Sequence, residues 1–135
     1  MTSKVRYEGF LRTTAVHLKS QTQIETDAPT DNNGKGERFS PTDLVATALA
    51  SCMFTIMGIV AERNQIDIEG CEATVEKIMA SNPRRIGEIK VDIYFPEGKT
   101  YTEKDKKLLE HAAHTCPVAE SLHRDCIQTI TFHWH

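Results

Sequence analysis

The stretch FSPTDLVATALASCMFTIMGIVAE, residues 39–62, decides how the rest of this chain must fold. Ser40 is a good helix N-cap, Pro41 suits the first helical position, and Asp43 stands where a capping box places its carboxylate. The pattern predicts one helix over residues 41–63, about 35 Å long at roughly 1.5 Å per residue. Because apolar residues occupy nearly all of its sides, we expect the sheet or a second subunit to cover it.

The composition limits the classes of partner. The chain has 135 residues, a net charge of -3 and 26% charged residues, which favours a single domain, residues 1–135, and gives no basic surface for nucleic acid. Thr47, Ser51 and Thr55 interrupt the apolar run, so we expect no membrane span. The N-terminal residues lack the apolar core of a signal peptide, and the expected location is therefore cytoplasmic.

Alternation and turn residues predict the elements around the helix. The expected order is βββ-α-ββ-α-β, an α+β fold with antiparallel sheets. Its parts are three strands within residues 4–27, the long helix, a hairpin of strands at 71–79 and 89–95, a helix capped by Thr102, and a strand over 127–135.

The four cysteines of the chain are its main candidates for reactive residues. They form no C-x-x-C pair, so zinc-ribbon and thioredoxin-type sites lack their signature, and in a reducing compartment all four are thiols by default. Cys71 and Cys126 stand near predicted strand starts, which favours a structural role.

Cys52 lies in the middle of the long predicted helix. A free cysteine there is often a small buried hydrophobe, and burial raises its pKa. A reactive Cys52 thiolate would need a nearby cation, for which arginine is well suited because it stays charged when desolvated. The candidate arginines are Arg12, Arg38, Arg84 and Arg85.

Cys116 directly precedes Pro117, which can open a helical turn. A cysteine at a helix N-terminus has its thiolate favoured, but Cys116 can equally close the buried stripe of Leu108 and Ala112. Two thiols on two core helices could meet if their Cα atoms came within about 5.5 Å. One would then reduce a peroxide and become a sulfenic acid, and the other would condense with it to a disulfide.

The histidines offer an alternative site. His111, His114 and Cys116 are grouped near one helix end, and His133 and His135 share a strand face, so either group could bind a metal. Neither has the four ligands at fixed spacing that a structural site requires. We therefore expect no metal, and exposed histidines are the simpler interpretation.

Several motifs together resemble the OsmC/Ohr family, the osmotically inducible and organic hydroperoxide resistance proteins. They are FSPTDL at 39–44, ALASC at 48–52, SNPRRI at 81–86 and CPV at 116–118, with TDAP at 26–29 resembling the generic OsmC-like subgroup. The resemblance implies an intertwined α+β homodimer whose active site lies at the subunit interface.

The resemblance also implies a thiol-dependent peroxidase that prefers organic hydroperoxides. Cys52 matches the attacking cysteine and Cys116 the resolving one. No metal or organic cofactor is implied, and a dithiol is the implied reductant, with dihydrolipoyl groups serving the best-studied branch.

One position departs from that branch, which has a glutamate ten residues before the attacking cysteine to hold the activating arginine. Here Thr42 occupies the position, and Asp43, its neighbour, points about 100° away on a regular helix. Arg12 falls near the family's early arginine, and Arg38 competes with it. Two other functions therefore stay open: a dimer that binds a small hydrophobic ligand without catalysis, and a thiol enzyme with a non-peroxide substrate.

Overall fold

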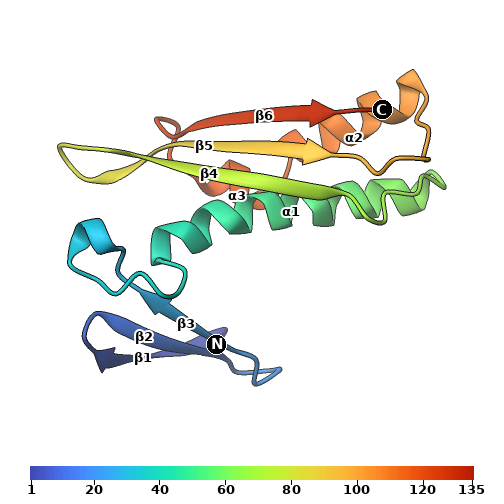
Figure 1. The fold of residues 1–135 in the computed structure, drawn as a ribbon. Helices are drawn as coiled ribbons and strands as arrows, with labels where there is room; N and C mark the ends of the chain where they lie inside the picture. The colour runs from blue at the N-terminus through green and yellow to red at the C-terminus, as the bar shows by residue number, and fades with distance from the viewer. The chain divides into compact units, whose positions relative to one another are not determined.

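The computed structural model describes all 135 residues, which divide into two compact units, residues 1–45 and 46–135. Figure 1 shows the elements in chain order. They are β1 (Ser3–Gly9), β2 (Arg12–His17), β3 (Gln23–Asp27), the 3-10 helix η1 (Thr30–Asn32), α1 (Pro41–Arg63), β4 (Glu72–Ala80), β5 (Arg85–Tyr94), α2 (Glu103–His114), α3 (Pro117–Ser121) and β6 (Ile127–His133). The mixed α+β class predicted from the sequence is confirmed.

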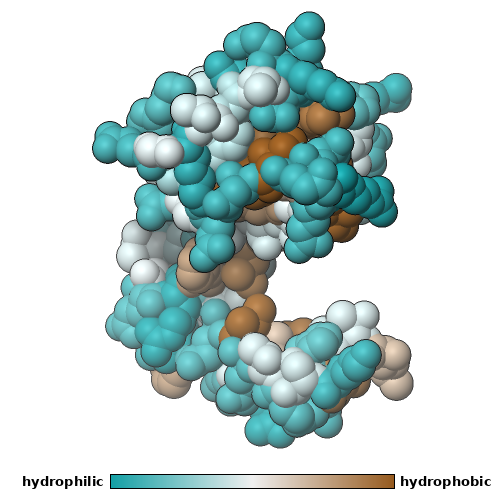
Figure 2. All heavy atoms as spheres, turned by 90° about the vertical axis from the view of Figure 1, so that its right-hand side faces the viewer, coloured by the Kyte–Doolittle hydropathy of each residue, from teal (hydrophilic) through white to brown (hydrophobic).

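The first unit contains an antiparallel meander of β1, β2 and β3. Val5, Ala15 and Ile24 are paired across the three strands and therefore share one face of the sheet. Val5 is 62% exposed and Ile24 47%, so this apolar face is uncovered in a single chain. Figure 2 shows apolar atoms at the surface of both parts of the chain, each time among hydrophilic ones.

The loop after β3 is closed by backbone hydrogen bonds. Gly34 donates its N–H to the carbonyl of Pro29 at 2.9 Å, and Gly36 donates to the carbonyl of Ala28 at 3.2 Å. A Cβ at position 34 would lie 1.8 Å from the Ala28 carbonyl oxygen, so only glycine fits there without a backbone shift.

The start and end of α1 agree with the prediction. Ser40 donates its backbone N–H to Asp43 Oδ2 at 2.9 Å, and Asp43 donates its own N–H to Ser40 Oγ at 3.0 Å. This reciprocal pair is a capping box, and it fixes where the long helix begins. The Asp43 carboxylate is therefore engaged in capping, as the sequence suggested.

The second unit is built on a sheet with strand order β4-β5-β6. Ile89, Val91 and Ile93 alternate along β5 and are almost fully buried on one face, which α1 and α2 cover. Leu49, Met53 and Met57 of α1 and Leu109 of α2 join them in a single apolar core. This core holds the middle of α1 and the end of α2 in fixed positions.

One part of the predicted topology is wrong. β6 pairs with β5 in parallel, with Val91 opposite Ile130, whereas the sequence analysis expected only antiparallel sheets. The connection between them contains α2 and the short α3, and such a helical crossover returns the chain to the end of the sheet where β5 began. Alternation along a strand does not reveal the direction of its neighbour, so the pattern could not show this.

The apolar part of α1 is longer than the sequence-based expectation. By length and composition alone, Pro41–Arg63 could cross a membrane, as the core helices of many soluble proteins could. Thr55 Oγ1 donates a hydrogen bond to the Ser51 carbonyl at 2.9 Å within the helix, so these hydroxyls do not interrupt it. The side of α1 that carries Leu49, Met53 and Met57 packs in the core of the second unit.

Candidate active site

The second unit brings Cys52 and Cys116 together. Cys52 lies in the middle of α1, and Cys116 is the N-cap residue of α3, directly after α2. Cys52 packs against the apolar cluster that contains Cys116, and it is close enough to raise the pKa of the Cys116 thiol. Two cysteines can be joined by a disulfide where their Cα atoms come within about 4.4–6.8 Å.

The two thiols differ in their access to solvent. Cys116 is 0% exposed and belongs to the apolar core together with Leu109 and Ala113. Cys52 is only partly buried and packs against the edge of that core. A reagent from solution therefore meets the Cys52 sulfur first.

Burial raises the pKa of the Cys116 thiol above its ordinary value. The backbone N–H of Ala119, which donates a hydrogen bond to Cys116 Sγ at 3.3 Å, acts in the opposite direction, and the neighbouring Cys52 raises the pKa further. Cys116 is consequently a protonated thiol at neutral pH. This protonation state suits a cysteine that waits for its partner to be oxidised.

The other two cysteines have no such partner. Burial raises the pKa of Cys71 to about 11, against a smaller opposing effect of Lys99, and burial also raises that of Cys126. All four cysteines are free thiols. Cys71 and Cys126 thus have the environment of inert structural residues, and Cys126 faces the core rather than solvent.

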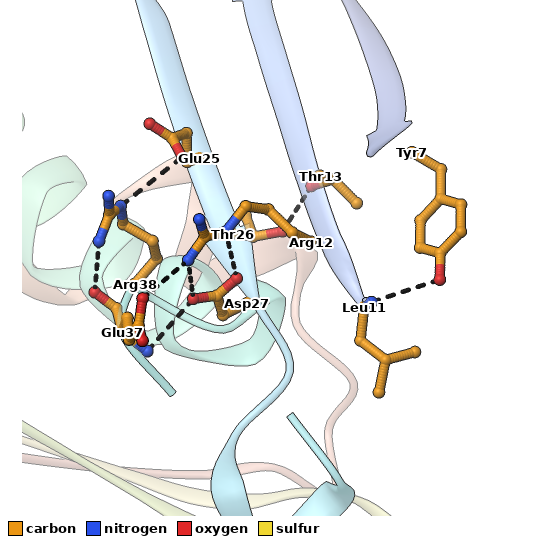
Figure 3. A network of polar contacts seen from close by, with 9 residues as sticks. All are labelled: Tyr7, Leu11, Arg12, Thr13, Glu25, Thr26, Asp27, Glu37 and Arg38. Atoms are coloured by element: carbon orange, nitrogen blue, oxygen red, sulfur yellow. Dashed lines mark hydrogen bonds and ion pairs between the residues drawn. The ribbon is translucent and has the colours of Figure 1, made fainter. Parts of the chain in front are cut away.

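In the first unit, Arg12 is held by Asp27 (Figure 3). Arg12 Nε lies 2.7 Å from Asp27 Oδ1 and Arg12 Nη2 lies 2.8 Å from Asp27 Oδ2, which is a two-point ion pair. Arg12 also bonds Glu37 at 3.2 Å, and Glu37 donates its backbone N–H to Asp27. The carboxylate that holds Arg12 therefore comes from the end of β3 and not from α1.

Asp27 was not predicted as the partner of Arg12, because their pairing depends on the register of β2 and β3. Arg12 and Asp27 are direct cross-strand partners in the β2–β3 pair, and opposite charges favour that arrangement. With the register known, an arginine opening β2 and an aspartate closing β3 would have indicated the ion pair.

The other candidate arginines have different partners. Arg38 lies 3.7 Å from Glu25 and donates to the Glu37 carbonyl, also visible in Figure 3. Arg85 donates to the carbonyls of Ser81 and Pro83 in its own hairpin. Arg84, beside it, is exposed.

A sequence model described as OsmC-like protein matches residues 34–131. The chain belongs to the OsmC-like family. A crystal structure from Psychrobacter arcticus, described provisionally as an osmotic stress induced and detoxification response protein, is 53% identical, with a TM-score of 0.94 over 98% of this chain and 96% of that one. Among curated proteins, none matches this chain.

More distant OsmC-like structures support the same fold. An organic hydroperoxide resistance protein OsmC from Legionella pneumophila is 16% identical, with a TM-score of 0.72 over 98% of this chain and 96% of that one. One from Elizabethkingia anophelis is 15% identical, with a TM-score of 0.76 over 100% of this chain and 97% of the other. At these identities the two structures support the fold of the chain and nothing beyond it.

The histidines of this OsmC-like chain do not form a cluster of ligands. No three His, Cys, Asp or Glu side chains come together in a way that could hold a metal ion. His133 Nε2 lies 2.8 Å from Asp92 Oδ1, and its ring stacks on Tyr94. His114 instead meets the ring of Phe132 edge-on. The paired thiols remain the candidate site.

Proposed function

We propose that this OsmC-like protein is a thiol-dependent peroxidase that reduces organic hydroperoxides, with Cys52 as the attacking residue and Cys116 as the resolving one. The observation that carries this proposal is the packing of a partly buried cysteine, Cys52, against the apolar cluster that contains a fully buried one, Cys116. That arrangement suits a two-step reaction in which the first sulfur meets substrate and the second sulfur closes onto it.

The Cys52 thiolate attacks the terminal oxygen of the hydroperoxide and the O–O bond breaks. Cys52 becomes a sulfenic acid, and the alkoxide takes a proton from solvent and leaves as the alcohol. The Cys116 thiol then displaces the hydroxyl from that sulfur, which forms the Cys52–Cys116 disulfide and releases water. A dithiol supplies the two electrons that restore both thiols.

The surroundings of Cys52 favour a substrate with an apolar tail. Helical spacing places Ala48, Ile56 and Ile59 on the same side of α1 as Cys52. Ile59 is 41% exposed, so part of this side is open in a single chain. An alkyl or aryl hydroperoxide would bury its tail here, whereas hydrogen peroxide has none to bury.

The Cys52 thiolate would be stabilised by an arginine, and each candidate can be tested in turn. Replacing Arg12, Arg38, Arg84 and Arg85 singly with lysine removes the planar guanidinium but keeps a positive charge. We expect one of these variants to slow the reaction of Cys52 with iodoacetamide at neutral pH. Four unchanged reaction rates would show that Cys52 needs the guanidinium of none of these four arginines.

We further propose that the protein acts as a cytoplasmic homodimer. The uncovered apolar side chains Val5, Tyr7 and Ile24 of the first unit and Ile59 of the second support an interface with a second copy. Sedimentation equilibrium at micromolar concentration should give twice the chain mass of 15.2 kDa.

The central test is a reaction of the reduced protein with cumene hydroperoxide, followed by peptide mapping. We expect one Cys52–Cys116 disulfide per chain and no consumption of peroxide by Cys52→Ser. Cys71→Ser is the matched control, because Cys71 has no neighbouring cysteine, and it should react like the parent. Undiminished peroxide consumption by Cys52→Ser would refute the proposal, and copurified apolar ligand without turnover would indicate a binding protein.

A further inference from the structure

The unequal access to the two sulfur atoms also decides how the oxidised site is reduced. We infer that a reducing thiol attacks only the Cys52 sulfur of the Cys52–Cys116 disulfide, so that the mixed disulfide forms on Cys52 and Cys116 is the leaving group. This inference extends the proposed function, since it concerns the second half of the same cycle. It rests on the packing of Cys52 against the cluster that contains Cys116 and on the unequal burial of the two cysteines.

Geometry favours attack at Cys52. A thiolate attacks a disulfide sulfur from the side opposite the sulfur that leaves, nearly in line with the S–S bond. Attack on Cys116 would require a reagent to approach a sulfur that is 0% exposed within the core of α1, α2 and β5. Cys52 is only partly buried, so attack on its sulfur does not require the core to unfold.

The raised pKa of Cys116 as the leaving thiol slows attack at Cys52, but it does not change which sulfur is attacked. A thiol of higher pKa leaves more slowly, and burial raises the pKa of Cys116. The Ala119 N–H, 3.3 Å from Cys116 Sγ, offsets part of this effect because it can stabilise the departing thiolate. A slower leaving group only lowers the rate, whereas a buried sulfur cannot be reached at all until the core opens locally.

Attack at Cys52 gives a balanced reduction by the dithiol that the proposed function already names. In the first step the donor thiolate bonds to Cys52, the S–S bond breaks, and Cys116 leaves and takes up a proton. In the second step the donor's other thiol displaces Cys52, so that the donor becomes a disulfide and both cysteines are thiols again. A monothiol lacks that second group, and Cys116, which lies close to Cys52, can displace it and restore the original disulfide.

The test uses a C71S/C126A variant, which retains only the pair. Oxidation with diamide forms the disulfide without peroxide, and a brief reaction with glutathione is then stopped by acid. Blocking with N-ethylmaleimide after unfolding, followed by mass spectrometry, locates glutathione and maleimide on each cysteine. We expect glutathione on Cys52 and maleimide on Cys116, with a preference of about tenfold or more.

The matched control is the same oxidised variant unfolded in guanidinium chloride before glutathione is added. There both sulfur atoms are accessible, so the preference should largely disappear. The inference would be overturned if glutathione were found mainly on Cys116, or equally on Cys52 and Cys116, in the folded protein. It would also be overturned if diamide formed no Cys52–Cys116 disulfide. A disulfide that forms with diamide but not with cumene hydroperoxide would refute the peroxidase proposal and leave this inference standing.

Discussion

Arg12 and Asp27 form a two-point ion pair across β2 and β3, with Nε to Oδ1 at 2.7 Å and Nη2 to Oδ2 at 2.8 Å. Asp27 is 0% exposed and also accepts the backbone N–H of Glu37, at the far end of the loop that precedes α1. One carboxylate therefore joins two strands and that loop. Removing its charge would leave Arg12 with only the exposed Glu37 as a partner.

We predict that Asp27→Asn lowers the stability of the first unit. The amide cannot accept both guanidinium hydrogen bonds, and a buried ion pair that loses one partner is strongly destabilised. Hydrogen exchange of the β2 and β3 amides should show the loss. Glu25→Gln, which alters the looser 3.7 Å contact with Arg38, is the control and should exchange almost like the parent.

Acid should weaken the same unit. The hydrogen bond from Arg12 holds the pKa of Asp27 below its ordinary value, so the ion pair contributes fully above the unfolded pKa of about 4. That contribution is lost as the pH falls through the lower folded pKa. We expect β2 and β3 amide protection to decline below about pH 4 in the parent and less steeply in Asp27→Asn. Parallel declines in both proteins would contradict the assignment.

Replacing Cys116 by serine should separate the two halves of the proposed reaction. Cys52 would still be oxidised, but no thiol would remain beside it, so the sulfenic acid should persist and react with dimedone. We expect one peroxide consumed per chain and then no turnover. Continued turnover with a dithiol would show that Cys116 is not the resolving residue.

Alanine should change the stability of the protein in opposite directions at Gly34 and at Gly58. Gly34→Ala places a Cβ against the Ala28 carbonyl and should destabilise by about 1–3 kcal/mol. Gly58→Ala lies inside α1, where a new Cβ meets nothing within 4 Å, and should stabilise by about 1 kcal/mol through helix propensity. Urea unfolding of both variants measures the difference.

Leu109 and Leu108 are neighbours on α2 with different surroundings. Leu109 is 0% exposed beneath the Cys116 region of the core, and Leu109→Ala should cost about 3 kcal/mol. Leu108 lines an open groove with Lys104 and His111, so Leu108→Ala should cost about 1 kcal/mol or less. Equal losses in urea unfolding would contradict the description of this core.

Local signals predicted the elements well. The capping boxes at Ser40–Asp43 and Thr102–Asp105 are both present, because each depends on residues three positions apart. The alternation that predicted the β4–β5 hairpin also depends on neighbours in sequence, and this hairpin is present.

Features that depend on distant residues were less accessible to sequence reasoning. The direction of β6 follows from how the crossover packs, and the role of Asp27 follows from strand register. The closeness of Cys52 and Cys116 depends on how α1 and α2 share one face of a sheet. The sequence could suggest that these thiols meet, but only packing determines that one of them is sealed from solvent.

The crossover between β5 and β6 has a further consequence, because it carries Cys116. In the proposed cycle, oxidation ties this connection to the middle of α1 and closes a covalent ring over residues 52–116. By chain entropy, a ring of that size would stabilise the fold by about 4 kcal/mol. The oxidised form would therefore resist proteases longer than the reduced form.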